Sequence, residues 1–154
     1  MKTLIVYDSW YGNTAKIAEA VADGLGSDVT LVKANGDPFK DLAEAELLIV
    51  GSPTHGGVPT PAIKEFLQAI REGALAGKDV AAFDTRAAAK FLKIIGFAAN
   101  RTAKQLQHKG GKLIAPPEGF YVISKEGPLV KGEIERAEQW AAGIIKHAQA
   151  AAFV

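Results

Sequence analysis

Cysteine is absent from this chain of 154 residues. Its absence excludes a disulfide scaffold, thiol catalysis, and zinc or iron–sulfur sites with cysteine ligands. Long apolar runs are also missing, since none approaches the roughly 20 residues that a membrane-spanning helix needs. The run near the N-terminus, Leu4 to Tyr7, is too short for the core of a signal peptide. We therefore expect a cytoplasmic protein with no membrane span.

An excess of either charge is lacking as well. The sequence has 18 Lys and Arg against 17 Asp and Glu, a formal net charge of +1. This balance excludes an acidic disordered tail and gives no uniform field for nucleic acid, so no nucleic-acid partner is expected. The charges are nevertheless unevenly distributed. Residues 85–117 contain no acidic residue but hold Arg86, Lys90, Lys93, Arg101, Lys104, Lys109 and Lys112.

Internal repeats and linkers are not found in the sequence. A chain of this length suits one domain, so we expect a single domain over residues 1–154. Because Met1 leads directly into the first apolar run, we expect a free-standing protein rather than a module of a larger one.

Short apolar runs alternate along the chain with helical patterns. The runs are mostly continuous rather than alternating, which is typical of strands covered on both faces, as in a parallel sheet. They occupy Leu4–Tyr7, Val29–Val32, Leu47–Val50, Val80–Phe83 and Leu113–Ala115.

Between these runs, apolar residues repeat at helical spacing. Ile17, Val21 and Leu25 predict one helix, and Gly24 and Gly26 are expected to end it. Further helices are predicted from Thr60–Pro61 to before Gly73, over 98–109 and from about Lys131, with a short one near 37–45.

Five strands alternating with helices predict an α/β fold, a three-layer α/β/α sandwich around a five-stranded parallel sheet. In the order 2-1-3-4-5, the loops after strands 1 and 3 lie side by side, with the loop after strand 4 next to them. Ligands bind in that crevice. Segments 8–14, 51–59 and 84–97 are therefore expected to carry the chemistry.

The first of these segments predicts a phosphate cradle. Ser9 and Thr14 supply hydroxyls, Asn13 supplies an amide, and Gly12 allows a ligand to approach the backbone closely. The free amides at the start of the following helix point to the same place. A cup without lysine suits a terminal phosphate monoester, and ordinary turn and cap chemistry is the alternative reading.

Other phosphate and catalytic motifs are absent. Gly51 to Gly56 has the Walker spacing, but Gly57 stands where lysine is required, and no GxGxxG follows the first strand. A phospho-receiver would need an acidic residue where Gly51 stands. The three histidines have no metal-ligand spacing, and no GxSxG signature is present. We therefore predict no metal site and assign no catalytic acid or base.

The other two segments offer contacts for a flat ligand. Gly56 and Gly57 allow the backbone to approach such a ligand and its peptide groups to change orientation. A flexible connection before the next helix is the alternative reading. In the third segment, Asp84 is expected to accept a hydrogen bond from a ring N–H, the alternative being a surface loop with an ordinary ion pair.

Together these motifs resemble the flavodoxin family over essentially the whole chain. They are Ser9-Trp10-Tyr11-Gly12-Asn13-Thr14, Ser52-Pro53-Thr54-His55-Gly56-Gly57 and Phe83-Asp84-Thr85-Arg86. The resemblance implies non-covalent FMN in a site with three parts. Ser9 and Tyr11 to Thr14 would hold the phosphate, Thr54, His55 and Gly56 would meet the isoalloxazine near N5, and Asp84, Thr85 and Arg86 would meet its pyrimidine edge. Trp10, Pro53 and Gly57 complete the predicted site.

Two residues depart from the family pattern. Tyr11 stands where the family usually has threonine, and Ala87 is nearest to the place of a stacking tyrosine. The aromatic residues left to cover the ring are Trp10, His55, Phe91 and Phe97. For each of them, packing within the protein is the alternative role.

The resemblance implies an FMN-binding, flavodoxin-like electron-transfer protein with a redox partner protein. The basic segment 85–117, which has no acidic residue, favours an acidic partner. Within it, Arg86, Lys90 and Lys93 are expected to stabilise reduced, anionic flavin. One alternative is a quinone or flavin reductase that uses a nicotinamide nucleotide, NAD(P)H, because quinone reductases of the tryptophan-repressor-binding type share the Tyr-Gly pair and the Ser-Pro-Thr loop. A second is a non-redox interaction protein that has lost flavin, which Tyr11 and Ala87 suggest.

Overall fold

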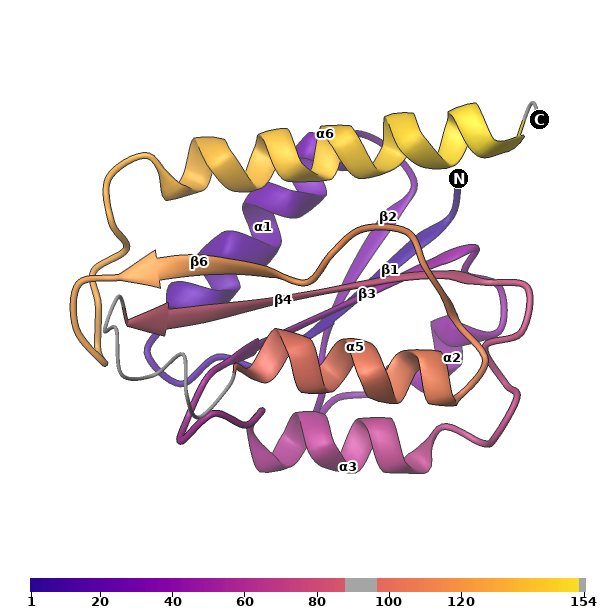
Figure 1. The fold of residues 1–154 in the computed structure, drawn as a ribbon, viewed down its shortest axis with the longest axis horizontal. Helices are drawn as coiled ribbons and strands as arrows, with labels where there is room; N and C mark the ends of the chain where they lie inside the picture. The colour runs from indigo at the N-terminus through magenta and orange to yellow at the C-terminus, as the bar shows by residue number, and fades with distance from the viewer. Residues whose placement is uncertain (88–96, 153–154) are drawn as a thin grey trace.

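A computed structural model describes residues 1–87 and 97–152. Helices pack on both faces of one sheet (Figure 1). The strands are β1 (Thr3–Tyr7), β2 (Val29–Lys33), β3 (Leu47–Pro53), β4 (Asp79–Ala87), β5 (Lys112–Leu113) and β6 (Glu118–Val122). The helices are α1 (Asn13–Leu25), α2 (Phe39–Leu42), α3 (Pro61–Ala69), α5 (Ala98–His108) and α6 (Glu133–Ala152).

The predicted strand order is confirmed. The sheet runs β2-β1-β3-β4-β5, and each pair of neighbours is parallel. The structure adds a sixth strand, because β5 pairs with the start of β4 and β6 pairs in parallel with its last five residues. Both strands thus occupy the same edge of β4 in succession.

The sequence pattern missed this division of the last strand. Pro116 and Pro117 lie between β5 and β6, and proline cannot donate a hydrogen bond to a ladder. In β6, Phe120 and Val122 are buried whereas Tyr121 is exposed. The search for continuous apolar runs therefore overlooked β6.

Each face of the sheet carries its own hydrophobic core, which explains the continuous apolar runs. Ile5 faces α1 and α6, where it packs with Ile17 and Ala141. Its neighbour Leu4 faces the opposite side, in the core that includes Phe66 of α3 and residues of α2 and α5. Figure 1 shows α1 and α6 above the sheet and α3 and α5 below it. Full burial of each such side chain contributes about 1.5–3 kcal/mol.

Gly24 has a different role from the one predicted. Helix α1 continues through it and ends at Leu25, before Gly26, which has a φ of 92°. A Cβ on Gly24 would collide with the backbone oxygen of Glu138 in α6. Gly24 therefore allows α1 and α6 to approach each other closely.

An aromatic cluster fills the core beneath the end of β3. Phe83, Phe120 and Trp140 meet edge to face, with ring centroids 5.9–6.1 Å apart. The Phe83 ring occupies the space where a side chain on Gly51 would lie. Only a residue without a Cβ therefore fits at position 51.

The loops after β1 and β3 lie next to each other and to the end of β4, as the strand order predicts. The amide of Asp8 donates to the carbonyl oxygen of Gly51 at 3.1 Å, and the amide of Thr54 donates to that of Thr85 at 2.9 Å. Over residues 1–87 and 97–152, no helix combines the length and apolar character needed to cross a bilayer.

Candidate cofactor site

A cleft of about 320 Å³ opens between the loops after β1 and β3 and the end of β4. Its volume lies at the lower end of the range for sites that bind small molecules and cofactors. Most of the predicted site residues line it. The lining consists of Trp10, Tyr11, Asn13, Thr14, Pro53, Thr54, His55, Gly56, Gly57, Thr85, Arg86, Ala87, Val122 and Lys125.

Ser9 supports the first loop from outside the cleft lining. Its Oγ accepts hydrogen bonds from the amides of Gly12, at 3.1 Å, and Ala15, at 3.2 Å. Gly12 has a φ of 88°, and a Cβ there would meet nothing within 4 Å. The structure therefore shows Ser9 shaping the loop, and because its hydroxyl can still donate, its predicted contact with a phosphate stays a prediction.

The start of α1 retains donors for an anion. Within the described residues, the amides of Asn13 and Thr14 donate to no other group. The first turn of α1 contains no acidic residue, so no carboxylate offsets the positive end of the helix dipole. This end of the cleft therefore suits a phosphate group.

Side-chain contacts hold these donors in place. The hydroxyls of Thr14 and Thr85 are 2.7 Å apart, and both residues are buried. The side-chain Nδ2 of Asn13 donates to the carbonyl oxygen of Glu126 at 3.1 Å, which leaves its backbone amide free. Asp8 accepts from the amide of Ser9 at 2.9 Å and from the hydroxyl of Thr60 at 2.5 Å. These bonds tie the first loop to α3 and to the segment after β6.

The second loop is a tight turn rather than an open connection. His55 and Val58 exchange backbone hydrogen bonds of 3.0 and 3.1 Å. Gly56 and Gly57 between them have φ values of 58° and 81°, the pattern of a type I′ turn. These conformations favour glycine at both positions, so the turn presents backbone to the cleft with little side-chain bulk.

Trp10 and His55 connect the first two loops. Their rings stack with centroids 4.1 Å apart and an interplanar angle of 25°. His55 Nε2 is buried and has no hydrogen-bond partner among the described residues. Burial lowers the pKa of His55, Lys125 lowers it further, and Asp8 opposes the shift. A neutral imidazole with one unpaired nitrogen therefore lies at the cleft.

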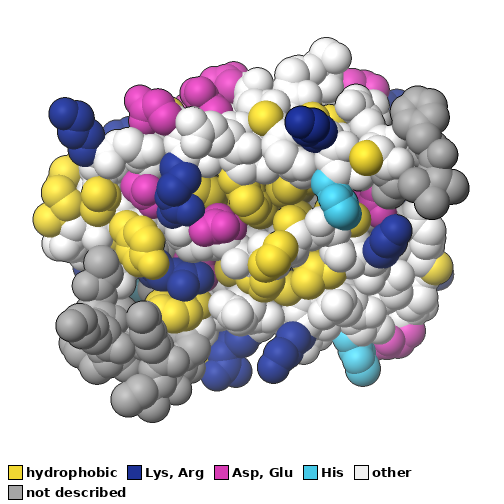
Figure 2. Space-filling view, turned by 45° about the horizontal axis from the view of Figure 1, so that its top comes forward, with side chains coloured by type: hydrophobic (Ala, Val, Ile, Leu, Met, Phe, Trp, Pro, Cys, Tyr) yellow, Lys and Arg dark blue, Asp and Glu magenta, His cyan; other side chains and the backbone are white. Residues whose placement is uncertain are grey.

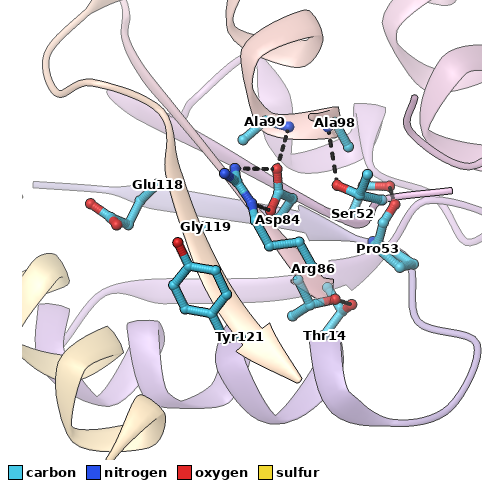
Figure 3. A network of polar contacts seen from close by, with 12 residues as sticks. Thr14, Ser52, Pro53, Asp84, Arg86, Ala98, Ala99, Glu118, Gly119 and Tyr121 are labelled. Carbon is cyan, nitrogen blue, oxygen red and sulfur yellow. Dashed lines mark hydrogen bonds and ion pairs between the residues drawn. The ribbon is translucent and has the colours of Figure 1, made fainter. Parts of the chain in front are cut away.

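Asp84 lies behind the cleft rather than in its lining. Its fully buried carboxylate accepts from Arg86 Nε and Nη2, both at 2.7 Å, and from the amide of Ala99 at 2.9 Å. Figure 3 shows these three residues joined at the start of α5. Burial raises the pKa of Asp84, and Arg86 opposes that shift. Both oxygens thus accept hydrogen bonds from within the protein, and the predicted contact of Asp84 with a ring N–H stays a prediction.

Arg86 is held from several sides. Its guanidinium pairs with Asp84, lies 3.5 Å from the centroid of the Phe97 ring, and leaves no room for a side chain on Gly119. The Asp84 carboxylate offsets the charge that was expected to stabilise reduced flavin. Phe97, one of the aromatic residues predicted to be able to cover a flavin ring, packs on the guanidinium of Arg86. Lys90, Phe91 and Lys93 lie outside the described residues.

Sequence reasoning did not place Val122 and Lys125 in the site. Both come from the end of β6 and the segment that follows it. They reach the cleft because β6 pairs with the last residues of β4. Recognising β6 would have been the only route to them, since neither residue belongs to a motif.

The comparisons with known proteins agree with this geometry. The sequence model of the family described as Flavodoxin matches residues 5–140. A flavodoxin of Aquifex aeolicus (strain VF5) is 35% identical over 91 residues, which cover 54% of this chain and 49% of that protein. The match thus spans about half the length of that curated relative.

Solved structures share the fold over nearly the whole chain. Oxidised Flavodoxin 1 from Bacillus cereus has a TM-score of 0.79 at 21% identity, covering 96% of this chain and 99% of that one. A flavodoxin, WrbA-like protein from Agrobacterium tumefaciens has a TM-score of 0.76 at 26% identity, covering 96% and 97%. With the family match covering most of the sequence and the sheet in the expected order, the chain belongs to the flavodoxin family.

Proposed function

We propose that this protein binds one FMN without a covalent bond and carries electrons between partner proteins. FMN is the cofactor that membership of the flavodoxin family supports. The observation that carries the proposal is the cleft itself, which has free helix amides and hydroxyls at one side and a glycine turn at another.

The residues present fit the two chemically different ends of FMN. The amides of Asn13 and Thr14 and the buried Thr14 hydroxyl would receive the phosphate. Trp10 and His55, which join the first two loops, and the Gly56–Gly57 turn would border the ring. The unpaired His55 Nε2 would gain a polar partner there, which removes the cost of leaving it unsatisfied. The roles of these residues toward FMN remain predictions.

Bound FMN supplies the electron chemistry, and the chain supplies binding and environment. The buried Asp84 fixes Arg86 at the cleft wall, and Lys125 brings a positive charge to the same cleft. Neutral His55 adds no charge. Because Asp84 offsets the charge of Arg86, the field that favours a more negative cofactor comes mainly from Lys125.

A titration of the cofactor-free protein with FMN tests the proposal. Binding should quench flavin fluorescence, and riboflavin, which lacks the phosphate, should bind at least about tenfold more weakly because charged hydrogen bonds contribute about 1.5–3 kcal/mol. Replacing Thr14 by Val should reduce the difference in affinity between FMN and riboflavin. Absence of quenching, or equal affinity for FMN and riboflavin, would contradict the proposal.

The WrbA-like neighbour favours a second candidate, a reductase that uses a nicotinamide nucleotide. Mixing the FMN-loaded protein with NADPH or NADH separates the two functions. Rapid bleaching of the flavin absorbance would favour the reductase, whereas an electron carrier should require a separate reductase protein.

A further inference from the structure

A second groove, of about 600 Å³, is larger than the cofactor cleft. Helices α3 and α5 form its walls, and both begin at the end of the sheet where the cofactor cleft opens (Figure 1). The groove is lined by Val58, Pro59, Lys64, Leu67, Gln68, Phe97, Asn100, Arg101, Lys104 and Gln105. None of these residues is used in the proposed binding of FMN.

The charge of this groove has one sign. Lys64 comes from α3, whereas Arg101 and Lys104 come from α5, and the lining contains no Asp or Glu. In the described part of the chain, these three exposed cations form no ion pair. By contrast, Figure 2 shows a face on which Lys and Arg are interspersed with Asp and Glu.

The shape of the charge distribution favours an extended ligand over a compact one. Arg101 and Lys104 are one turn apart on α5, and Lys64 lies on the opposite wall. Arg101 Nε already donates to the carbonyl oxygen of Gly57 at 3.0 Å, so the guanidinium is tied to one wall. Val58, Leu67 and Phe97 add apolar surface between the charges. Cations on both walls, with apolar residues in the same lining, match a chain segment that alternates acidic and apolar residues.

The groove borders the cofactor cleft. Gly57, whose carbonyl oxygen accepts from Arg101, also lines the cleft. Phe97 lines the groove and covers Arg86, which lines the cleft. The amide of Ala98 at the start of α5 donates to Thr54 Oγ1 at 3.1 Å. A molecule seated in the groove therefore lies beside the cleft.

We propose that the groove between α3 and α5 docks an acidic segment of the redox partner protein and so brings that partner to the edge of the cofactor cleft. The redox role of this partner rests on the proposed function, whereas docking itself requires no cofactor. Three unpaired cations on a concave surface steer an acidic surface toward it and fix its orientation.

A fluorescein-labelled decapeptide that alternates Glu and Leu is a direct probe. Its fluorescence anisotropy should rise with added cofactor-free protein at low salt, and a peptide with Gln in place of Glu should not bind. Raising the salt to about 0.3 M shortens the Debye length to about 6 Å and should weaken binding severalfold. Equal binding of the Gln peptide would overturn the proposal.

Two matched triple variants locate the binding. Removing the groove charges with K64Q, R101Q and K104Q together should weaken peptide binding about tenfold or more, since each such charge contributes about a factor of two to five. Removing three exposed charges elsewhere with K33Q, K40Q and K146Q should change it less than twofold. Equal losses in both variants would show an effect of net charge alone and would overturn the site. Circular dichroism checks that both variants are folded.

Two further arms test the nature of the ligand and its purpose. Displacement of the peptide by micromolar inorganic pyrophosphate would assign the groove to small phosphates instead of an acidic segment. On protein loaded with FMN and reduced, saturating peptide should slow oxidation by ferricyanide, because the groove borders the cleft. An unchanged oxidation rate would overturn the redox role of the groove. Failure of the protein to bind FMN would contradict the proposed function, but the peptide-binding experiments on cofactor-free protein would still test docking.

Discussion

Replacing Arg86 by Gln should destabilise the protein strongly, because it leaves the Asp84 carboxylate buried without its charged partner. Asp84 is fully buried, and the side chain of Arg86 is 12% exposed. Unit charges about 4 Å apart attract each other by about 4 kcal/mol at an effective dielectric of about 20. Loss of one partner from a buried pair costs about 3–5 kcal/mol. We expect a loss of that size in the free energy of unfolding at neutral pH.

The loss should depend on pH in a defined direction. Burial raises the pKa of Asp84 in the folded protein, so between the unfolded and the folded pKa the native state binds the proton more tightly than the unfolded chain does. This group's contribution to stability therefore falls as pH rises from the unfolded pKa toward the folded pKa. Arg86 opposes the shift, so its removal should extend the fall to higher pH. R86Q should be closer to the wild type at about pH 5 than at about pH 8.

Urea unfolding of the cofactor-free protein at both pH values measures this effect, with circular dichroism as the signal. The double variant D84N/R86Q is the control, since it removes the buried charge and should recover much of the stability and most of the added pH dependence. A loss below about 1 kcal/mol in R86Q, or a loss that D84N does not relieve, would refute the reasoning.

Three further predictions concern other parts of the fold and the cleft. Gly24→Ala should lower the free energy of unfolding by about 1–3 kcal/mol, because the new Cβ collides with α6. Gly143→Ala is the control: its Cβ meets nothing within 4 Å, so it should raise the free energy of unfolding by about 0.5–1 kcal/mol. Urea unfolding measures both changes. Burial lowers the pKa of His55, so its protonation opposes folding as pH falls below about 6.5, and His55→Phe should lose less thermal stability than the wild type between about pH 7.5 and pH 5.5. Lys125→Gln should weaken FMN binding severalfold at low salt and less at high salt, whereas Lys131→Gln, outside the cleft lining, should leave FMN titrations unchanged.

The sequence was sufficient to predict the strand order, and most of the residues that it assigned to the site line one cleft. Runs such as Leu47–Val50 are apolar throughout because both faces of the sheet are covered, and this pattern is visible without a structure. The loops then follow from the rule that ligands bind at the carboxyl ends of the strands. The same pattern could not reveal β6, in which the exposed Tyr121 interrupts the buried residues Phe120 and Val122.

The contacts that individual residues make within the site were harder to predict. Residue types indicated that Ser9 and Asp84 belonged to the site, but both were expected to touch the ligand. In the structure they accept from the backbone amides of Ala15 and Ala99, which the local sequence does not single out, and their contacts with a ligand stay predictions. Gly24 was taken for the end of a helix because its contact with α6 involves a segment far along the chain. Such long-range contacts are set by packing rather than by local preference.

Gly51 limits what protein engineering can do with this scaffold. An acidic side chain at the end of β3, as a phospho-receiver would need, would have to displace the Phe83 ring and with it the aromatic cluster that includes Phe120 and Trp140. A new catalytic group is therefore more easily installed at Ala87, which lines the cleft, than at Gly51. The scaffold leaves room for new chemistry in its loops while its central strands resist it.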